Sequence, residues 1–159
     1  MRGLRRSSDG FTFIELLVAT AVILILASAA LPIARISIRR QKENELHNDL
    51  RVMRAAIDQF KNYADAGRIA STDIQFGSEN YPTSLQQLVD GVALANDASG
   101  RKMKFLRRVP IDPLTNTTDW GLRSYQDLPN STTWGGQNVY DVYSKADGKG
   151  LDGTKYKDW

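Results

Sequence analysis

The sequence predicts an α+β fold in which a long N-terminal helix, with a membrane half and an amphipathic half, packs on a small antiparallel sheet followed by a loop-rich C-terminus. Three observations predict it. Residues 11–34 are almost entirely apolar, and residues 33–66 contain no Pro or Gly and repeat apolar residues every three or four positions. Two short segments of strand character then precede a tail rich in Gly, Asp and Lys.

The composition excludes several classes of protein. The 159 residues include 21 Lys+Arg and 18 Asp+Glu, a formal net charge of +3, and the basic residues form no stripe that would indicate nucleic-acid binding. There is no cysteine, which excludes disulfides and thiolate metal sites. The single histidine, His47, gives little support for a Ser-His-Asp relay. No phosphate-binding loop or metal-hydrolase spacing is present. We therefore expect a structural protein and not an enzyme.

The apolar run of residues 11–34 is long enough to cross a membrane. As a helix it would measure roughly 36 Å, against about 30 Å for the hydrocarbon core of a bilayer, and its single charge is Glu15. Pro32 is expected to loosen the helix, because proline removes one donor and crowds the preceding turn. The leader arginines favour a cytoplasmic N-terminus. The arginines that bracket the run are Arg2, Arg5, Arg6, Arg35, Arg39 and Arg40.

The amphipathic stretch continues the same helix. Its apolar residues follow steps of three and four and so share one stripe, while charged residues occupy the other faces. Gly67 marks the expected end, which gives a helix of roughly 50 residues, or about 75 Å. That length indicates a first half buried in lipid or among copies of the chain, and a second half that anchors a small domain. The predicted stripe comprises Leu46, Leu50, Met53, Ile57, Phe60 and Ala64.

The rest of the chain predicts short elements joined by loops. Ser84 indicates the start of a short helix, and residues 121–125 and 139–143 are candidate strands. Residues 144–159 are expected to form an ordered loop. Five aromatic residues are expected to fill the core between helix and sheet: Trp120, Tyr125, Trp134, Tyr140 and Tyr143.

The junction of the leader and the apolar run carries the main functional motif. Gly10 has no side chain to obstruct a peptidase acting at the cytoplasmic face of a membrane, and Phe11 begins the run. Glu15 is unusual, because a carboxylate inside an apolar span costs about 2.5 kcal/mol or more unless it is paired. Cleavage between Gly10 and Phe11 would supply a partner, a new α-ammonium group four residues away. The pattern therefore indicates that cleavage of the leader creates the positive group with which the buried Glu15 carboxylate pairs.

This motif resembles the prepilin signal of the type IV pilin superfamily, a short basic leader, Gly and then Phe-Thr-Leu-Ile-Glu-Leu, with Phe13 here in place of the usual leucine. The resemblance implies a pilin-like fold, cleavage after Gly10 by prepilin peptidase and N-methylation of Phe11. It also implies that Glu15 pairs with the N-terminus of a neighbouring subunit and sets register during assembly. Pro32 falls where family members have a helix-loosening proline. The matching residues are Gly10, Phe11, Thr12, Phe13, Ile14, Glu15 and Leu16.

Two other interpretations of the N-terminus stay open. A basic start and an apolar run also describe a secretory signal, with Ala27-Ser28-Ala29 as a small-residue cleavage site that would release a soluble periplasmic binding protein. A plain single-span anchor would account for the length of the run. The continuation of the run to Ala34 and the charge at Glu15 count against a secretory signal. A plain anchor does not explain Gly10 and Glu15.

Beyond the span, the sequence resembles the major, G-type pseudopilin of type II secretion systems. This implies a homopolymer that drives protein export together with minor pseudopilins, prepilin peptidase and the inner-membrane assembly platform. It implies a single-pass protein of the bacterial inner membrane, with a prepilin leader at 1–10, a transmembrane and filament-core helix at 11–34 and a periplasmic domain at 35–159. A type IV pilin or minor pilin serving adhesion, motility or DNA uptake is the alternative. The matching segments are Tyr81-Pro82-Thr83, Val109-Pro110-Ile111-Asp112-Pro113, Trp120-Gly121 and Val142-Tyr143-Ser144-Lys145-Ala146-Asp147-Gly148.

G-type members of the family bind a calcium ion in the C-terminal loop, which implies a site here formed by Asp147, Asp152 and the backbone carbonyl of Ser144. Calcium takes about six to eight oxygen ligands. The second family aspartate corresponds to Thr154 in this chain, so Asp152 is the expected substitute. Three nearby lysines oppose a cation site, and without an ion the first or last of them is expected to pair with Asp147. These are Lys145, Lys149 and Lys155.

Overall fold

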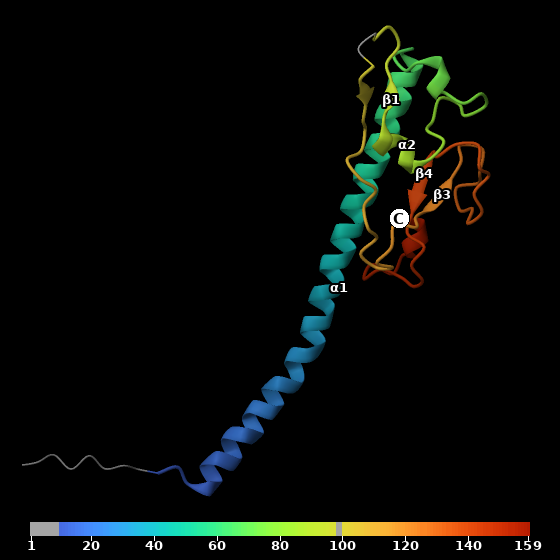
Figure 1. Ribbon diagram of the computed structural model, residues 1–159. Helices are drawn as coiled ribbons and strands as arrows, with labels where there is room; N and C mark the ends of the chain where they lie inside the picture. Colours follow the sequence, from blue (N-terminus) through green and yellow to red (C-terminus); the bar gives the residue numbers. More distant parts are fainter. Residues whose placement is uncertain (1–9, 98–99) are drawn as a thin grey trace, which may run out of the picture. The chain divides into compact units, whose positions relative to one another are not determined.

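The structure, a computed structural model, describes residues 10–97 and 100–159, and for residues 29–33 it describes the backbone alone. The leader arginines and the side chain of Pro32 lie outside the described residues, so their roles stay predictions. One long helix is followed by short elements (Figure 1). In chain order they are α1 (Phe13–Asp65), η1 (Ser71–Asp73), α2 (Leu85–Asp90), β1 (Val92–Ala93), β2 (Lys102–Met103), β3 (Gly121–Arg123), β4 (Asp141–Tyr143) and η2 (Tyr156–Asp158).

The long helix α1 contributes to two compact units, Met1–Arg39 and Arg40–Trp159. Its 53 residues are close to the predicted 50. It ends where expected, because Gly67 adopts φ +63° and its N–H donates to Ala64 O at 2.9 Å. The N–H of the next residue donates to Tyr63 O at 2.9 Å, which completes the paired hydrogen bonds of a Schellman cap.

The predicted apolar stripe of α1 forms the centre of the core in the second unit. All six of its residues are 6% exposed or less, which confirms the periodicity argument. Figure 1 shows α2, β1, β3 and β4 gathered along this part of the helix. The α+β arrangement, a long helix packed on small antiparallel sheets, is therefore confirmed. The buried residues that pack against the stripe are Ile69, Leu85, Leu88, Val92, Leu106, Trp120, Val139, Val142 and Tyr156.

Helix α2 begins where the sequence predicts, because the hydroxyl of Ser84 accepts a hydrogen bond from Gln87 N at 3.2 Å. After it, β1 and β2 pair antiparallel with Val92 opposite Met103, a hairpin that the sequence did not predict. Gly91 leads into this hairpin with φ +80°, and a Cβ there would lie 2.6 Å from Met103 O. A glycine is required at this position both by the backbone and by the approach of β2.

The second sheet pairs β3 with β4 in antiparallel register, with Gly121 opposite Tyr143 and Arg123 opposite Asp141. The structure confirms both predicted strands, each with shorter bounds. Gly121 is required by packing alone, because a Cβ there would lie 2.2 Å from the ring of Tyr143.

The expected aromatic core is correct for two residues of five. Trp120 and Tyr143 are 4% and 5% exposed. The expectation is wrong for the other three, which lie outside the buried core. Two of their rings, those of Tyr125 and Tyr140, pack against Tyr81 instead, with centroids 5.3–5.9 Å apart. The exposed residues are Tyr125 (57%), Tyr140 (46%) and Trp134 (39%).

The packing of Gly121 gives a first prediction. We expect Gly121→Ala to lower the free energy of unfolding by about 1–3 kcal/mol, because the new methyl group overlaps the ring of Tyr143. In a Tyr143→Leu background, which lacks the overlapping ring atoms, the same substitution should have a smaller effect. Urea unfolding of the unaltered chain, the two single variants and the double variant measures this double-mutant cycle. Equal effects of Gly121→Ala in both backgrounds would contradict the steric explanation.

Candidate functional site

The peptide bond predicted to be cleaved lies in an open stretch of chain. Gly10 is exposed, and a Cβ placed on it would have no heavy atom within 4 Å. The side chain of Phe11 is 80% exposed. The bond between them is therefore accessible to a peptidase, and cleavage and N-methylation at this bond stay predictions.

Thr12 positions the conspicuous glutamate at the start of α1. Its hydroxyl accepts a hydrogen bond from Glu15 N at 3.3 Å, and its carbonyl accepts one from Leu16 N at 3.1 Å. The spacing Thr-x-x-Glu is that of a helix-capping box, a local pattern from which the start of the helix can be read in the sequence. It fixes Glu15 in the first turn, where the positive end of the helix dipole favours a carboxylate.

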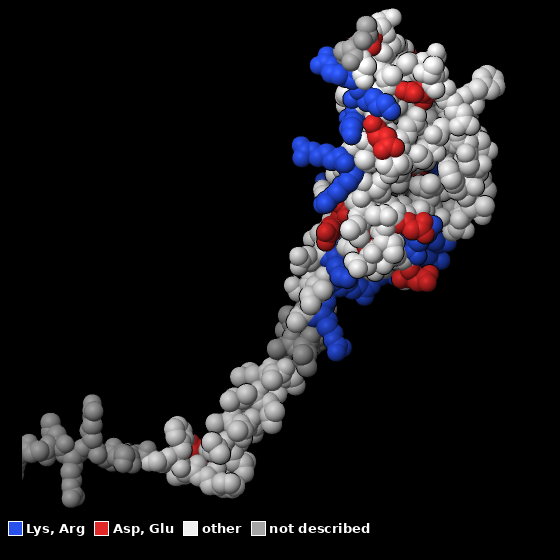
Figure 2. All heavy atoms as spheres, viewed as in Figure 1, with Lys and Arg blue, Asp and Glu red and all other residues white. Residues whose placement is uncertain are grey.

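The first part of α1 is apolar on every side and has no covering. Every residue from 11 to 28 is exposed. Figure 2 shows charged side chains gathered on the second unit and almost none on this part of the helix. A helix that is hydrophobic all round is stable in water only when something buries it. The large exposed side chains are Phe11, Phe13, Ile14, Leu16, Leu17, Val18, Val22, Ile23, Leu24, Ile25 and Leu26.

Among the described residues, no helix combines the length and the apolar character required to span a bilayer.

The C-terminal loop, residues 144–159, is the second candidate site. Its first residue, Ser144, is fully buried, and its hydroxyl donates to Asp112 Oδ2 at 2.5 Å. Asp112, also fully buried, caps its own turn by accepting from Leu114 N at 2.8 Å. The hydroxyl of Ser144 also accepts from Ala146 N at 3.1 Å. Ser144 thus connects the start of the C-terminal loop to a buried turn 32 residues away in sequence.

The two predicted calcium ligands with carboxylates have other surroundings. Asp152 accepts hydrogen bonds from the N–H and the hydroxyl of Thr154, at 2.9 and 2.7 Å, and these bonds lower the pKa of its carboxyl below the ordinary value. Asp147 lines two shallow hollows together with lysines. One of these lysines, Lys145, forms an ion pair with Asp119, with Nζ 2.6 Å from Oδ1. The lysines of the two hollows are Lys145, Lys149, Lys155 and Lys157.

The side chains present do not fit a calcium site. The described residues contain no group of three His, Cys, Asp or Glu that could hold a metal ion. Calcium requires several hard oxygen ligands, whereas Asp147 shares a hollow with lysines and Asp152 is engaged by its own turn. Calcium binding by Ser144, Asp147 and Asp152 is an expectation from the resemblance alone, and it stays untested.

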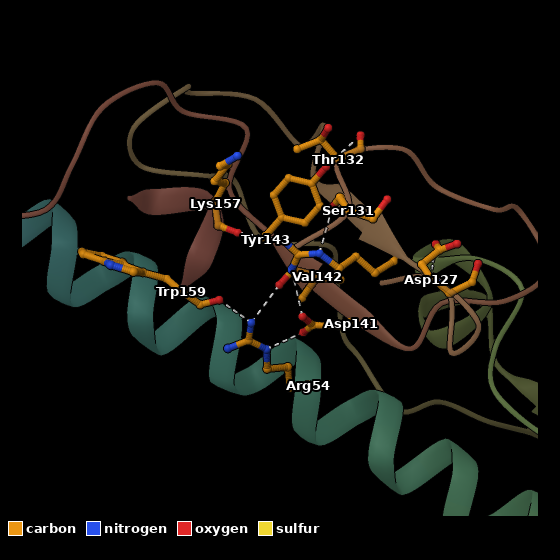
Figure 3. A network of polar contacts seen from close by, with 11 residues as sticks. Arg54, Asp127, Ser131, Thr132, Asp141, Val142, Tyr143, Lys157 and Trp159 are labelled. Atoms are coloured by element: carbon orange, nitrogen blue, oxygen red, sulfur yellow. Dashed lines mark hydrogen bonds and ion pairs between the residues drawn. The ribbon is translucent and has the colours of Figure 1, made fainter. Parts of the chain in front are cut away.

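A polar network that the sequence did not predict joins α1 to the sheet and to the C-terminal loop (Figure 3). Arg54 of α1 donates to Asp141 Oδ1 at 2.7 Å, to Val142 O at 3.0 Å and to Trp159 O at 2.5 Å. One guanidinium therefore connects the helix, strand β4 and the final residue of the loop. Its fork of donors suits this task, which a lysine could not perform in the same way.

A second arginine completes the network from the sheet side. Arg123 is 5% exposed and donates to Asp141 Oδ2 at 3.1 Å, to Ser131 O at 3.0 Å and to Lys157 O at 2.8 Å. Its guanidinium also lies 4.2 Å from the ring centre of Tyr143. The Arg123–Asp141 pair lies directly across β3 and β4, so opposite charges on two predicted strands were the only signal in the sequence.

Two kinds of similarity link the chain to known proteins. Residues 5–31 match the family described as the prokaryotic N-terminal methylation motif. The chain is 29% identical over 155 residues to the type II secretion system core protein G of Pseudomonas aeruginosa, covering 91% of this chain and 88% of that protein. No solved structure matches.

These two similarities cover different features of the chain. The methylation motif includes Gly10, Phe11 and Glu15, and it implies anchoring in the inner membrane through the N-terminal helix. The similarity to core protein G extends over 91% of the chain, far beyond the methylation motif. The chain thus carries the methylation motif of type IV pilin-like proteins and is similar over nearly its whole length to the major pseudopilin of type II secretion, which confirms the resemblance found in the sequence.

Proposed function

We propose that this chain is a structural subunit of a type II secretion pseudopilus, cleaved after Gly10 and polymerised through its N-terminal helix to drive protein export. The observation that carries the proposal is the uncovered apolar surface of residues 11–28, on a helix whose second part is anchored in a folded domain. The similarity to core protein G over 91% of the chain supports it. The role is structural and not catalytic.

The apolar part of α1 suits two environments in turn. In the membrane its side chains face lipid, and in a filament they face the same side chains of other copies. Because both surroundings are apolar, transfer from lipid to filament changes hydrophobic burial little, so close packing and polar pairing decide the association. Outside the membrane, the apolar area kept from water stabilises the filament by roughly 25 cal/mol per Å².

Glu15 supplies the polar pairing. In an apolar surrounding an unpaired carboxylate is unfavourable by about 2.5–3.5 kcal/mol on insertion scales. Cleavage after Gly10 creates an ammonium group on Phe11, and N-methylation leaves an amine charged. A neighbouring subunit in the correct register brings its Phe11 ammonium to this Glu15, whereas a shifted subunit leaves both charges unpaired. Register is thereby set by an energetic penalty against every other alignment.

Location and partners follow from the same proposal. The leader lies in the cytoplasm, residues 11–34 span the inner membrane once, and residues 35–159 lie in the periplasm. Prepilin peptidase acts on Gly10, minor pseudopilins and further copies of the chain surround the helix, and the inner-membrane assembly platform of the secretion system receives the subunit. No nucleic acid is involved.

Processing is tested by the mass and N-terminal sequence of the chain from membranes of a host that contains prepilin peptidase. We expect a chain that begins at N-methylated Phe11. In a host without the peptidase, and for Gly10→Val in either host, we expect the uncut chain, because the valine side chain obstructs the position that glycine leaves open. A start at Ala30 would mean an ordinary secretory signal and would overturn the proposal.

Assembly is tested by Glu15→Ala in the same host. We expect normal cleavage but a yield of sheared filaments lower by tenfold or more, since the loss of roughly 2.5 kcal/mol of selective pairing corresponds to more than tenfold in an equilibrium constant. Glu45→Ala, an exposed glutamate on the same helix but in the second unit, is the matched control.

Two outcomes of the assembly test are informative against the proposal. Normal filaments from Glu15→Ala would remove the register argument. Long filaments on the cell surface, formed by the unaltered chain without the secretion system, would favour a type IV pilin serving adhesion, motility or DNA uptake.

A further inference from the structure

Three residues of α1 hold the C-terminal loop. Glu43, His47 and Arg54 are separated by four and seven positions, so they share one line on the helix surface, and the first and last are about three turns, or roughly 16 Å, apart. All three contact residues between 151 and 159. The loop is therefore attached to the helix along its length and not at one point.

The first attachment is a buried carboxylate. Glu43 is 7% exposed, and its two carboxylate oxygens accept from Leu151 N at 3.1 and 3.2 Å. Its Oε1 also accepts from the hydroxyl of Tyr156 at 2.9 Å. A buried charge is tolerated only when it is well hydrogen-bonded, and Leu151 N and the Tyr156 hydroxyl, two donors of the C-terminal loop, bond this carboxylate. The helix thus supplies the negative charge around which the loop folds.

The second and third attachments engage the last residue of the loop. The ring of His47 stacks on the indole of Trp159, with centroids 4.0 Å apart and an angle of 11° between the planes. Arg54 donates a hydrogen bond to the carbonyl of Trp159. The same indole packs edge-on against Tyr156 at 5.0 Å, so the contacts at Glu43 and at Trp159 support each other.

The charge balance of the loop opposes a cation. Residues 144–159 contain four lysines and three aspartates. Of the aspartates, Asp152 accepts hydrogen bonds from Thr154, and Asp147 lines a hollow together with lysines. The turn that contains Asp152 is closed by its own backbone, since Gly150 N donates to Thr154 O at 2.7 Å. The carboxylates to which the family resemblance assigns a calcium ion thus have lysines and the groups of Thr154 as neighbours.

We propose that the side chains of α1, and not a calcium ion, hold the C-terminal loop in this chain, with Glu43 and Arg54 as its two anchoring residues. The helix contributes one charge of each sign: Glu43 accepts from Leu151 N and the Tyr156 hydroxyl, and Arg54 donates to the Trp159 carbonyl as well as to Asp141 and Val142 of β4. The stability of the folded domain is then independent of calcium.

The direct test is thermal unfolding of the full chain in detergent, followed by near-UV circular dichroism, in calcium chloride and in the chelator EGTA. We expect the same midpoint in both. A bound ion at one hundred times its dissociation constant would raise the midpoint by roughly 5–10 °C. A shift of that size in the unaltered chain would overturn the proposal, and this result does not depend on any variant folding. Its loss in Asp147→Asn would place the ion at the C-terminal loop.

The anchoring role is tested by Glu43→Ala, with Glu45→Ala as the matched control two positions away on the exposed side of the same helix. Both substitutions change helix propensity equally, but only the first removes the acceptor for Leu151 N and the Tyr156 hydroxyl. We expect a midpoint lower by about 5 °C or more for Glu43→Ala, by the same amount with and without calcium, and little change for the control.

A milder variant covers the case in which Glu43→Ala does not fold. Arg54→Lys keeps the positive charge but has no fork to reach Asp141 and Trp159 together. We expect earlier protease cleavage within residues 144–159 than in the unaltered chain. Cleavage at an unchanged rate, or a rate restored by calcium, would contradict the anchoring role.

Discussion

One helix in two incompatible surroundings is the constraint on which the rest of the structure depends. From Phe13 to Ser28 the helix α1 is exposed on every side, whereas from Leu46 to Ala64 it presents one apolar stripe to a core. The stripe is satisfied within the chain, because the short elements after residue 66 cover it. The first part has no such covering among the described residues. A single chain therefore leaves the first part of the helix exposed, and in the proposed pseudopilus the membrane or neighbouring subunits cover it.

The polar groups of α1 follow the same geometry. One edge of the apolar stripe carries a line of polar residues, Glu43, His47 and Arg54. At 3.6 residues per turn, all three positions fall on the same side of the stripe. A segment that packs on the stripe therefore meets this line of polar groups as well. The C-terminal loop contains little apolar surface of its own apart from Tyr156 and the indole of Trp159. Because the loop buries little apolar surface, hydrogen bonds to buried or half-buried charges of α1 contribute much of its stabilisation.

How far the sequence predicts this structure depends on the distance between the residues involved. The stripe, the Ser84 cap and the Gly67 stop are local patterns, and each was found where expected. The two-residue strands β1 and β2 are too short to leave a periodic signal. The bond between Arg54 and Asp141 joins positions 87 residues apart, and neither residue is unusual in its own segment. Pairs of this kind become visible only when the fold brings the elements together.

Thr12 shows how a local bond prepares an interaction that the single chain does not make. In a complete capping box the Glu15 carboxylate would return to the N–H of Thr12, but only the bond from Glu15 N to the Thr12 hydroxyl is formed here. The backbone of the first turn is thus fixed while the carboxylate stays exposed, and no described residue pairs with it. A carboxylate that is paired within its own chain would not favour one alignment of a neighbouring subunit over another. One that is held in place and left unpaired would favour the single alignment that brings it a positive charge, as the register role proposed for Glu15 requires.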